Sequence, residues 1–588
     1  MRQPDETADE ARAERAGAAG SRWDAVVLAV CVLLPMGLAI VRVANMSDAA
    51  HDEGVLRAVG LGWTGGWRAL DAPFAAIFAW VPVGTRVARA ALASTVACGV
   101  AGGALFLIAR GLVRLVADAG VLGSVVAGIA SLAAMLSPAW QVEAVAPAGS
   151  CLGAALVLLS GATALGNLGP QGLRALLCGI AMAYEPLVGV AAIAAAAAAG
   201  EVRWRRALPW FAVGLVPFFV GLARRVSPLA MTAGVFARPF GERGESPAGA
   251  PLAVMQEVGT LSCVAVVAGA VIAWLAPEAR RAVVALAAVI TVGIIAMVLG
   301  APAGPSGYGG PVLAGIGAAY AIAAVAMQGI VRVVDQARVP YARASASMIL
   351  VLEAAIPARA ADDASVRADE RQAAASGAWN DAAFGALPAD TALLVGDPRV
   401  QTRLLATRAA GEMRADVAVV PLFDLAGPAA LHELARDPKL QSLWHDATLV
   451  GPPQEASLSA LASSRPITLP YDPAWERALA RHIVPVGMFG RFEPEPRGAS
   501  DRRRGLDETA PARDTLARLS SNDRELQALT ASLLRARLVA FAAAGERDVI
   551  GRGIDDLRPF APRDALSAEL VRRMSLGRGA IDLKDLPR

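Results

Sequence analysis

Long apolar runs separated by short polar loops fill residues 23–358, and the rest of the chain has a mixed pattern. Residues 24–44 carry one charge near each end, and a helix of about 20 such residues crosses about 30 Å of hydrocarbon. The pattern predicts about eleven spans. They lie near residues 24–44, 87–109, 120–136, 144–165, 172–199 (two short helices), 207–222, 253–275, 282–299, 311–331 and 343–357.

Two features refine this bundle. Residues 172–199 are too long for one span, and Tyr184-Glu185-Pro186 interrupts them. Because proline breaks helices and a glutamate in mid-bilayer is costly, we predict two short helices meeting at that tip. Residues 72–80 predict a short interfacial helix before the second long span.

Arginines near span ends predict the orientation, since basic loops stay on the cytoplasmic side. Most basic loops fall on one side, and Arg224 and Arg225 are exceptions. We expect a multi-pass protein of the bacterial inner membrane with a cytoplasmic N-terminus. The periplasmic side then receives residues 45–71, 137–143, the Tyr184 tip, residues 224–251, residues 301–310 and the soluble part.

The chain after the membrane part predicts a small α/β domain and a helical tail. Short β-rich runs alternate with helical patterns, which is typical of βα units. We expect strands at residues 391–396, 416–422, 447–450 and 467–469. The predicted organisation is a tail (1–22), a transmembrane domain (23–358), a linker (359–383), an α/β domain (384–496), a second linker (497–513) and a helical tail (514–588). One or two helical hairpins of tetratricopeptide type are a candidate for this tail, but one unit does not establish a repeat period.

Composition agrees with a mostly α-helical membrane protein. Of 588 residues, 55% are hydrophobic and 18% charged, and the net charge of +3 is too small to indicate a nucleic-acid partner. Residues 1–22 are polar, so residues from Trp23 onward are interpreted as a retained first span rather than a signal peptide. The five cysteines all lie in apolar runs, which predicts buried small side chains and no metal site.

The strongest candidate for chemistry is the first outward loop, which places Asp48, His51, Asp52 and Glu53 just beyond a span. Acidic residues at a membrane surface suit a general base or a metal site. The alternative is a solvated loop in which Asp52 caps a helix starting at Glu53, and the local sequence alone favours it.

Other charged residues fall on the same predicted side. Glu143 and Glu185 lie at helix tips, where they either line the same cavity or are simply solvated. Four arginines are candidates for binding a carrier phosphate, since guanidinium matches phosphate oxygens. They are Arg57, Arg68, Arg86 and Arg89. For the last two, the alternative is snorkelling at a span end.

Several motifs resemble one family. Asp52-Glu53-Gly54-Val55-Leu56 is similar to the D-S-G-E-L of its first outward loop. Arg89-Ala90-Ala91-Leu92-Ala93-Ser94 and Ser137-Pro138-Ala139-Trp140 resemble its Arg-x-x-Leu-x-Ser and Ser-x-x-Trp motifs, and residues 387–397 and 414–419 resemble its segments after the membrane part. The chain thus resembles, as a divergent member, the protein O-mannosyltransferase-like membrane proteins of the GT-C superfamily.

This resemblance implies a GT-C-like bundle and a hexosyltransferase that takes a sugar, with mannose one candidate, from a polyprenyl-phosphate carrier. The acceptor would be a protein or glycan on the periplasmic face, and Asp52 would be the general base. No cofactor is expected beyond the lipid-linked donor, and metal dependence stays open.

The family's glutamate is Val55 here and its HPPG histidine is missing. The alternatives are therefore an inactive scaffold that binds lipid or, through its helical tail, protein, and a transporter.

Overall fold

The computed structural model describes most of the chain, in two compact units. It leaves undescribed residues 1–3, 45–51, 61–67, 69, 83, 117–119, 167–169, 201–203, 224–245, 301–304, 337–341, 369–370, 412–413, 423–436, 451, 522, 577–580, 582, 584–585 and 588. One unit, here called the membrane unit, comprises residues 1–45, 62–225 and 235–369. The other, the soluble unit, comprises residues 46–61, 226–234 and 370–588.

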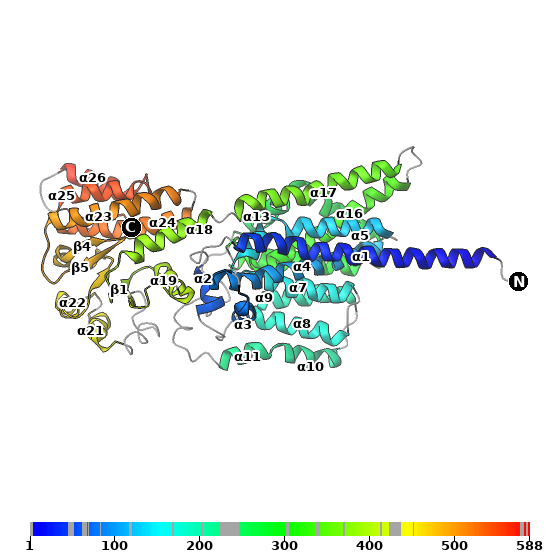
Figure 1. Cartoon of the computed structure of the whole chain (residues 1–588), viewed down its shortest axis with the longest axis horizontal. Helices are drawn as coiled ribbons and strands as arrows, with labels where there is room; N and C mark the ends of the chain where they lie inside the picture. The colour runs from blue at the N-terminus through cyan, green and yellow to red at the C-terminus, as the bar shows by residue number, and fades with distance from the viewer. Residues whose placement is uncertain are drawn as a thin grey trace. The chain divides into compact units, whose positions relative to one another are not determined.

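The membrane unit is built of helices that lie side by side (Figure 1). They are α1 (Pro4–Ala44), α3 (Asp71–Ile77), η2 (Phe78–Trp80), α4 (Arg86–Val116), α5 (Gly120–Met135), α6 (Pro138–Val145), α7 (Cys151–Leu165), α8 (Gln171–Tyr184), α9 (Pro186–Ala196), η3 (Ala197–Ala199), α10 (Trp204–Gly214), α11 (Val216–Ala223), α13 (Gly249–Val258), α14 (Thr260–Leu275), α15 (Arg280–Val298), α16 (Gly310–Gln336) and α17 (Ala342–Arg367).

Among the described residues, five helices are long and apolar enough to cross a membrane, or up to seven if each of two bent pairs is one span. The protein is therefore membrane-embedded. The predicted eleven spans are not confirmed, because several predicted runs are split into shorter helices. The run at 207–222 is divided between α10 and α11, and the run at 144–165 is divided between the end of α6 and α7.

Other predictions for this unit are confirmed. Helices α8 and α9 meet at Glu185, as the Tyr184-Glu185-Pro186 interruption predicts. The expected interfacial helix is α3 with η2, and it leaves Ile77 and Trp80 exposed. The apolar runs also bury four of the five cysteines, and Cys263 is half-buried.

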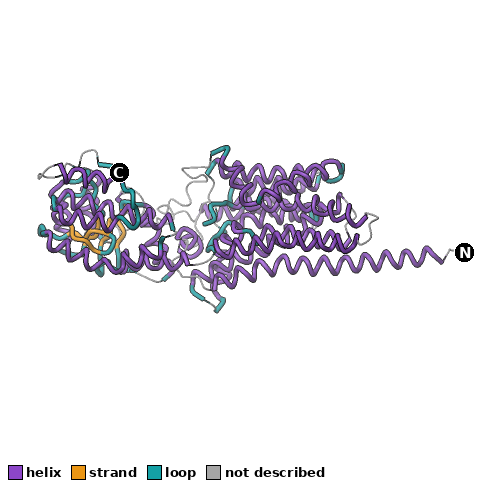
Figure 2. The backbone as a smooth tube through the Cα atoms, turned by 90° about the horizontal axis from the view of Figure 1, so that it is seen from above, coloured by secondary structure: helices purple, strands orange, loops and turns teal. Residues whose placement is uncertain are grey.

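The soluble unit is an α/β domain wrapped by helices (Figure 2). Its elements are α2 (Asp52–Val55), η1 (Leu56–Gly60), α18 (Arg371–Asn380), η4 (Asp381–Gly385), β1 (Ala392–Val395), α19 (Pro398–Ala410), β2 (Ala418–Pro421), η6 (Pro438–Leu440), α21 (Gln441–Leu449), α22 (Glu455–Ala462), β3 (Ile467–Leu469), η7 (Arg477–His482), β4 (Ile483–Val486), β5 (Phe489–Phe492), α23 (Ala499–Leu519), α24 (Arg524–Ala544), α25 (Arg547–Leu557) and α26 (Ala565–Leu576).

The five strands form one sheet in the order β2-β1-β3-β5-β4. Strand β1 is parallel to β2 and β3, as βα units require, whereas β5 is antiparallel to both β3 and β4. The β4–β5 hairpin closes at Gly487, whose φ of +53° lies in the left-handed region that two-residue hairpin turns need. Edge strand β4 tolerates Pro485, which has no N–H for a further partner.

Three expectations for this part of the chain are wrong. Residues 447–450 are not a strand, because residues up to Leu449 belong to α21. Both predicted linkers are helical: α17 and α18 occupy most of residues 359–383, and α23 begins at Ala499. Helix α23 has few large apolar side chains, but its Arg502 is fully buried and donates to the carbonyls of Ala480, Arg481 and Ile483. An arginine that satisfies main-chain carbonyls therefore anchors this helix.

Helix α24 is also long and apolar enough to cross a membrane, but its apolar residues pack inside the soluble unit. It packs on α25, η7 and β5 in the core of the soluble unit. Its buried Arg537 donates to Asp556 of α25 at 2.8 Å and to the Gly487 carbonyl at 3.0 Å. The predicted helical character of residues 514–576 is confirmed.

Candidate functional site

Four segments from separate parts of the membrane unit converge at one end of the bundle. Residues 68–71, 137–150, 184–185 and 305–309 are joined there by hydrogen bonds, and we call this place the Tyr184 end. Arg42 near the end of α1 donates to Gln141 at 2.5 Å, which places the end of the first span there as well. The sequence predicts that these loops share one side, and the hydrogen bonds confirm this for the described residues.

A buried triad forms the first half of the Tyr184 end. Arg68 Nε lies 3.0 Å from Asp71 Oδ2, and both side chains are almost completely buried. The Tyr184 hydroxyl donates to Asp71 Oδ1 at 2.9 Å and accepts from Arg68 Nε at 2.9 Å. Arg68 also donates to the Ala148 carbonyl. A guanidinium, a carboxylate and a phenol thus compensate one another out of contact with water.

Glu143 forms the second half. Its helix, α6, starts with Pro138 at its first position, directly after a bend of 62° from α5. The carboxylate is fully buried and accepts from Ser150 N at 2.7 Å, from Ser306 N at 2.9 Å and from the Ser306 hydroxyl at 2.6 Å. Position 149 must be glycine, since a Cβ there would meet the Glu143 carbonyl at 2.1 Å. Glu143 therefore ties the α6–α7 turn to the segment before α16.

Glu185 lies beside this group. It is buried and occupies the N-cap position of α9 in extended backbone, with Pro186 as the first helical residue. Glu143 and Glu185 are both close enough to Arg68 to interact with it electrostatically. The structure thus brings together three residues that the sequence singles out, namely Arg68, Glu143 and Glu185.

Two further candidates begin α4. Arg86 is exposed and Arg89 is half-buried. The Arg89 Nε atom is buried and has no hydrogen-bond partner among the described residues. A buried guanidinium nitrogen normally donates to an acceptor. An anionic group next to Arg89 would supply one.

The acidic first loop is placed elsewhere. Asp52 and Glu53 are the first two residues of α2, which belongs to the soluble unit, and nothing is described of their side chains. Asp48 lies outside the described residues. Arg57, in the π-helical turn η1, is buried rather than presented to a phosphate. The first loop and the Tyr184 end thus belong to different units.

Sequence reasoning did not assign site roles to Asp71, Tyr184 or Ser306. The weak signal for the first was an aspartate three residues after an arginine, at the start of a predicted helix. Tyr184 was noted only as part of a helix break, although it lies 113 positions from its partner Asp71. No local pattern reports such a contact.

Among the described residues no group of three or more His, Cys, Asp or Glu is arranged to hold a metal ion.

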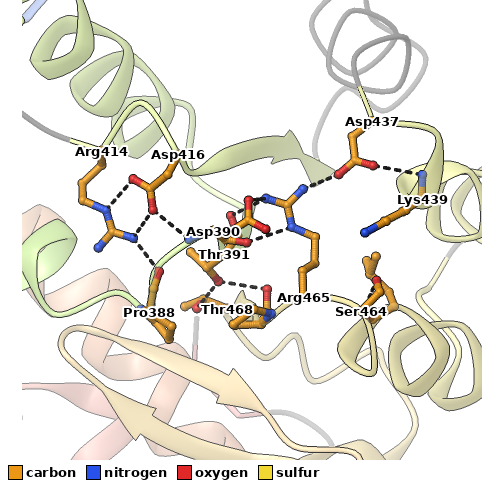
Figure 3. Close-up of polar contacts among 12 residues, drawn as sticks. Pro388, Asp390, Thr391, Arg414, Asp416, Asp437, Lys439, Ser464, Arg465 and Thr468 are labelled. Atoms are coloured by element: carbon orange, nitrogen blue, oxygen red, sulfur yellow. Dashed lines mark hydrogen bonds and ion pairs between the residues drawn. The ribbon is translucent and has the colours of Figure 1, made fainter.

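The soluble unit has its own polar cluster, at the amino ends of β1, β2 and β3 (Figure 3). Arg465 donates to the Asp390 carbonyl at 2.9 Å, lies 3.0 Å from the Asp390 carboxylate and also pairs with Asp437. Arg414 binds Asp416 at 2.9 Å, and Asp416 accepts from Asp390 N at 2.7 Å. The hydrogen bonds from Arg414 and from the Asp390 amide lower the pKa of Asp416 to about 2.

This cluster is better explained by loop anchoring than by ligand binding. Asp390 and Arg414 both have positive φ, at +55° and +60°, and their salt bridges hold these tight turns. Open α/β sheets bind ligands at the carboxyl ends of their strands. At that edge Asp397 lies between β1 and α19. Its side chain caps α19 by accepting from Arg399 N at 2.9 Å.

No family model, curated protein or solved structure matches the chain.

Proposed function

We propose that the protein is a membrane glycosyltransferase that moves a sugar from a polyprenyl-phosphate carrier to a hydroxyl group of a protein or glycan. The observation that carries the proposal is the Tyr184 end itself. Four loops converge there and bury Arg68, Asp71 and Glu143. Charges within a membrane domain are expensive and as a rule mark a functional region. The resemblance of the first loop and of residues 89–94 to GT-C proteins supplies the reaction class.

In the proposed reaction, the acceptor oxygen attacks the anomeric carbon of the donor sugar. The bond from that carbon to the carrier phosphate oxygen breaks, and the polyprenyl phosphate leaves with the electron pair. The acceptor proton passes to the carboxylate of Asp52, which acts as the general base. Asp52 is the catalytic residue of this scheme, on the strength of the resemblance and its place in the first loop.

The four candidate arginines differ in burial and in their contacts, which supports a choice among them for the carrier phosphate. Arg57 is buried, and Arg68 is already engaged with Asp71, Tyr184 and Ala148. We therefore assign the phosphate to Arg89 at the start of α4, with the exposed Arg86 one turn before it as a second candidate. A phosphate oxygen would give Arg89 Nε its acceptor and would stabilise the charge of the leaving group.

A non-catalytic scaffold is the second candidate, and one observation favours it. Arg68 and Asp71 compensate each other within the bundle, Glu143 is satisfied by Ser150 and Ser306, and the glutamate of the resembling motif is replaced by Val55, which is buried. A scaffold would keep such a network for stability alone.

The experiment that separates the two is sugar transfer in membranes containing the full-length protein, supplied with labelled polyprenyl-phosphate sugars. Wild type is compared with Asp52→Asn and Asp52→Glu. General bases contribute about 10²–10⁴-fold, so Asp52→Asn should lose at least about 100-fold while Asp52→Glu keeps measurable transfer. Wild-type protein that is folded but transfers from no donor would favour the scaffold. Unchanged transfer by Asp52→Asn would remove Asp52 from the mechanism.

A further inference from the structure

The middle of the first loop is an integral part of the soluble unit, although the chain on both sides of it belongs to the membrane unit. Helix α2 and the π-helical turn η1 together run from Asp52 to Gly60. Both pack against α19 of the α/β domain (Figure 1). A segment that the sequence presents as an acidic outward loop is thus docked on a folded domain.

The apolar side chains of the segment are buried. Val55 is 1% exposed and Leu56 is 2% exposed, and Ala58 is buried as well. Short surface loops do not usually bury consecutive apolar side chains. Burying a valine and a leucine removes much apolar surface from water, which favours the docked arrangement.

Helix α19 shows the same contact from the other side. A helix that covers a sheet normally leaves one face in solvent. In α19, however, no residue from Val400 to Ala410 is fully exposed. One side packs on β1 and β2, and the segment α2–η1 covers further surface.

Helix α19 is itself firmly held. Asp397 caps its start. Arg403 donates to Asn380 at 2.7 Å and to the Ser376 carbonyl at 3.1 Å, and its guanidinium lies 4.8 Å from the Trp379 ring centre. The surface that receives the loop is therefore part of the rigid core of the domain.

We propose that the α/β domain is a positioning element: through α19 it holds the segment α2–η1 and thereby sets the place of Asp52 at its start. The contact stands on burial and packing alone, whereas the role in transfer rests on the proposed function. The soluble domain then acts on the reaction through Leu56 and Val55 rather than by touching substrate. The burial of Val55 also explains why a glutamate would not fit at that position here.

The test uses the full-length protein with Leu56→Asp, which places a carboxylate in the buried contact. Leu449→Asp is the matched control, since Leu449 is 70% exposed on α21 of the same unit. Hydrogen exchange is measured for residues 52–60, for α19 and for the β3–β5 strands. We expect exchange in the first two regions to rise at least about tenfold in Leu56→Asp only, with the strands unchanged.

Sugar transfer by the same variants is the second readout. Positioning by α19 predicts at least a tenfold loss in Leu56→Asp and none in Leu449→Asp, because misplacing a catalytic group by about 1 Å is enough for a large loss. If the β3–β5 strands also lose protection from exchange in Leu56→Asp, the same two measurements are made on the milder variant Leu56→Ala, and its result is used instead.

Each outcome has a definite meaning. Unchanged exchange of α19 in Leu56→Asp and Leu56→Ala would overturn the contact. Loosened α19 with wild-type transfer would overturn the positioning role. Wild-type protein without any transfer would reject the proposed function and the positioning role together, while the exchange result would still decide whether the loop is docked.

Discussion

The charged side chains at the two ends of the membrane bundle differ in how exposed they are. At the opposite end, Arg110 of α4 lies 3.1 Å from Asp24 of α1, and Arg114 and Ser124 also bind this aspartate. We call this the Asp24 end. The Asp24 side chain is 21% exposed and that of Arg114 is 56% exposed. At the Tyr184 end, by contrast, Arg68 and Asp71 are 3% and 2% exposed.

The two ends therefore differ in how much their charged side chains cost to bury. Half-exposed charges near span ends cost little, and they are what the positive-inside pattern requires. Fully buried charges lose their hydration and persist only when partners compensate them. The Tyr184 end meets that cost with segments from four parts of the chain, which is why the proposed function is assigned to this end.

The largest loss of stability is expected when Arg68, at the Tyr184 end, is substituted. Arg68→Met leaves Asp71 buried without its cation, and removing one partner of a buried pair costs about 3–5 kcal/mol. Arg114→Met removes a half-exposed arginine and should cost less than about 1 kcal/mol. Thermal unfolding midpoints in detergent measure both. Equal shifts would show that the Tyr184 end does not depend on its buried pair.

Asp24→Asn gives an intermediate effect. It removes the charge that faces the buried Arg110, which keeps its hydrogen bond to the Gly120 carbonyl at 2.9 Å. We expect a loss of about 1–2 kcal/mol, between the two arginine variants, because Asn still accepts one hydrogen bond. A loss of stability as large as that of Arg68→Met would contradict the expected difference in stability between the two ends.

The smallest effect lies in the soluble unit, at Asp416. Its pKa of about 2 is below that of an unfolded aspartate, so the Arg414–Asp416 pair stabilises the fold above about pH 4. That contribution is lost as the pH falls from about 4 to about 2. The side chain is 39% exposed, so solvent screens the pair and Asp416→Asn should cost less than about 1 kcal/mol at pH 7.

Hydrogen exchange of β1 and β2 in urea measures this difference between wild type and Asp416→Asn. The two proteins should differ at pH 7 and converge towards pH 2. A difference that persists below pH 2 would mean that the pair does not act through the charge of Asp416.

The sequence predicts the local features of this fold well. The break at Tyr184-Glu185-Pro186, the interfacial helix before α4 and strands β1, β2 and β3 all follow from proline, charge and hydrophobic pattern over short windows. The β4–β5 hairpin was missed because its strands are four residues each and Pro485 interrupts the first.

The rest depends on contacts between distant residues. The sequence of residues 497–513 is charged and poor in large apolar residues and so predicts a linker, yet Arg502 of α23 is buried against carbonyls of η7 and β4. Glu143 was named as a candidate, but its partner Ser306 lies 163 positions away. Val55 stands where the resembling motif has a glutamate, and its burial, which no local pattern predicts, gives that difference a physical reason.

The most direct test of the account compares the two ends in one transfer assay, with Glu143→Gln and Asp24→Asn in the same membranes as wild type. Both variants keep a similar shape and remove one charge. The account predicts that wild type transfers sugar, that Glu143→Gln loses at least about tenfold because the loops at the Tyr184 end shift, and that Asp24→Asn stays within about twofold. Equal effects of the two variants, or no transfer by folded wild type, would contradict it.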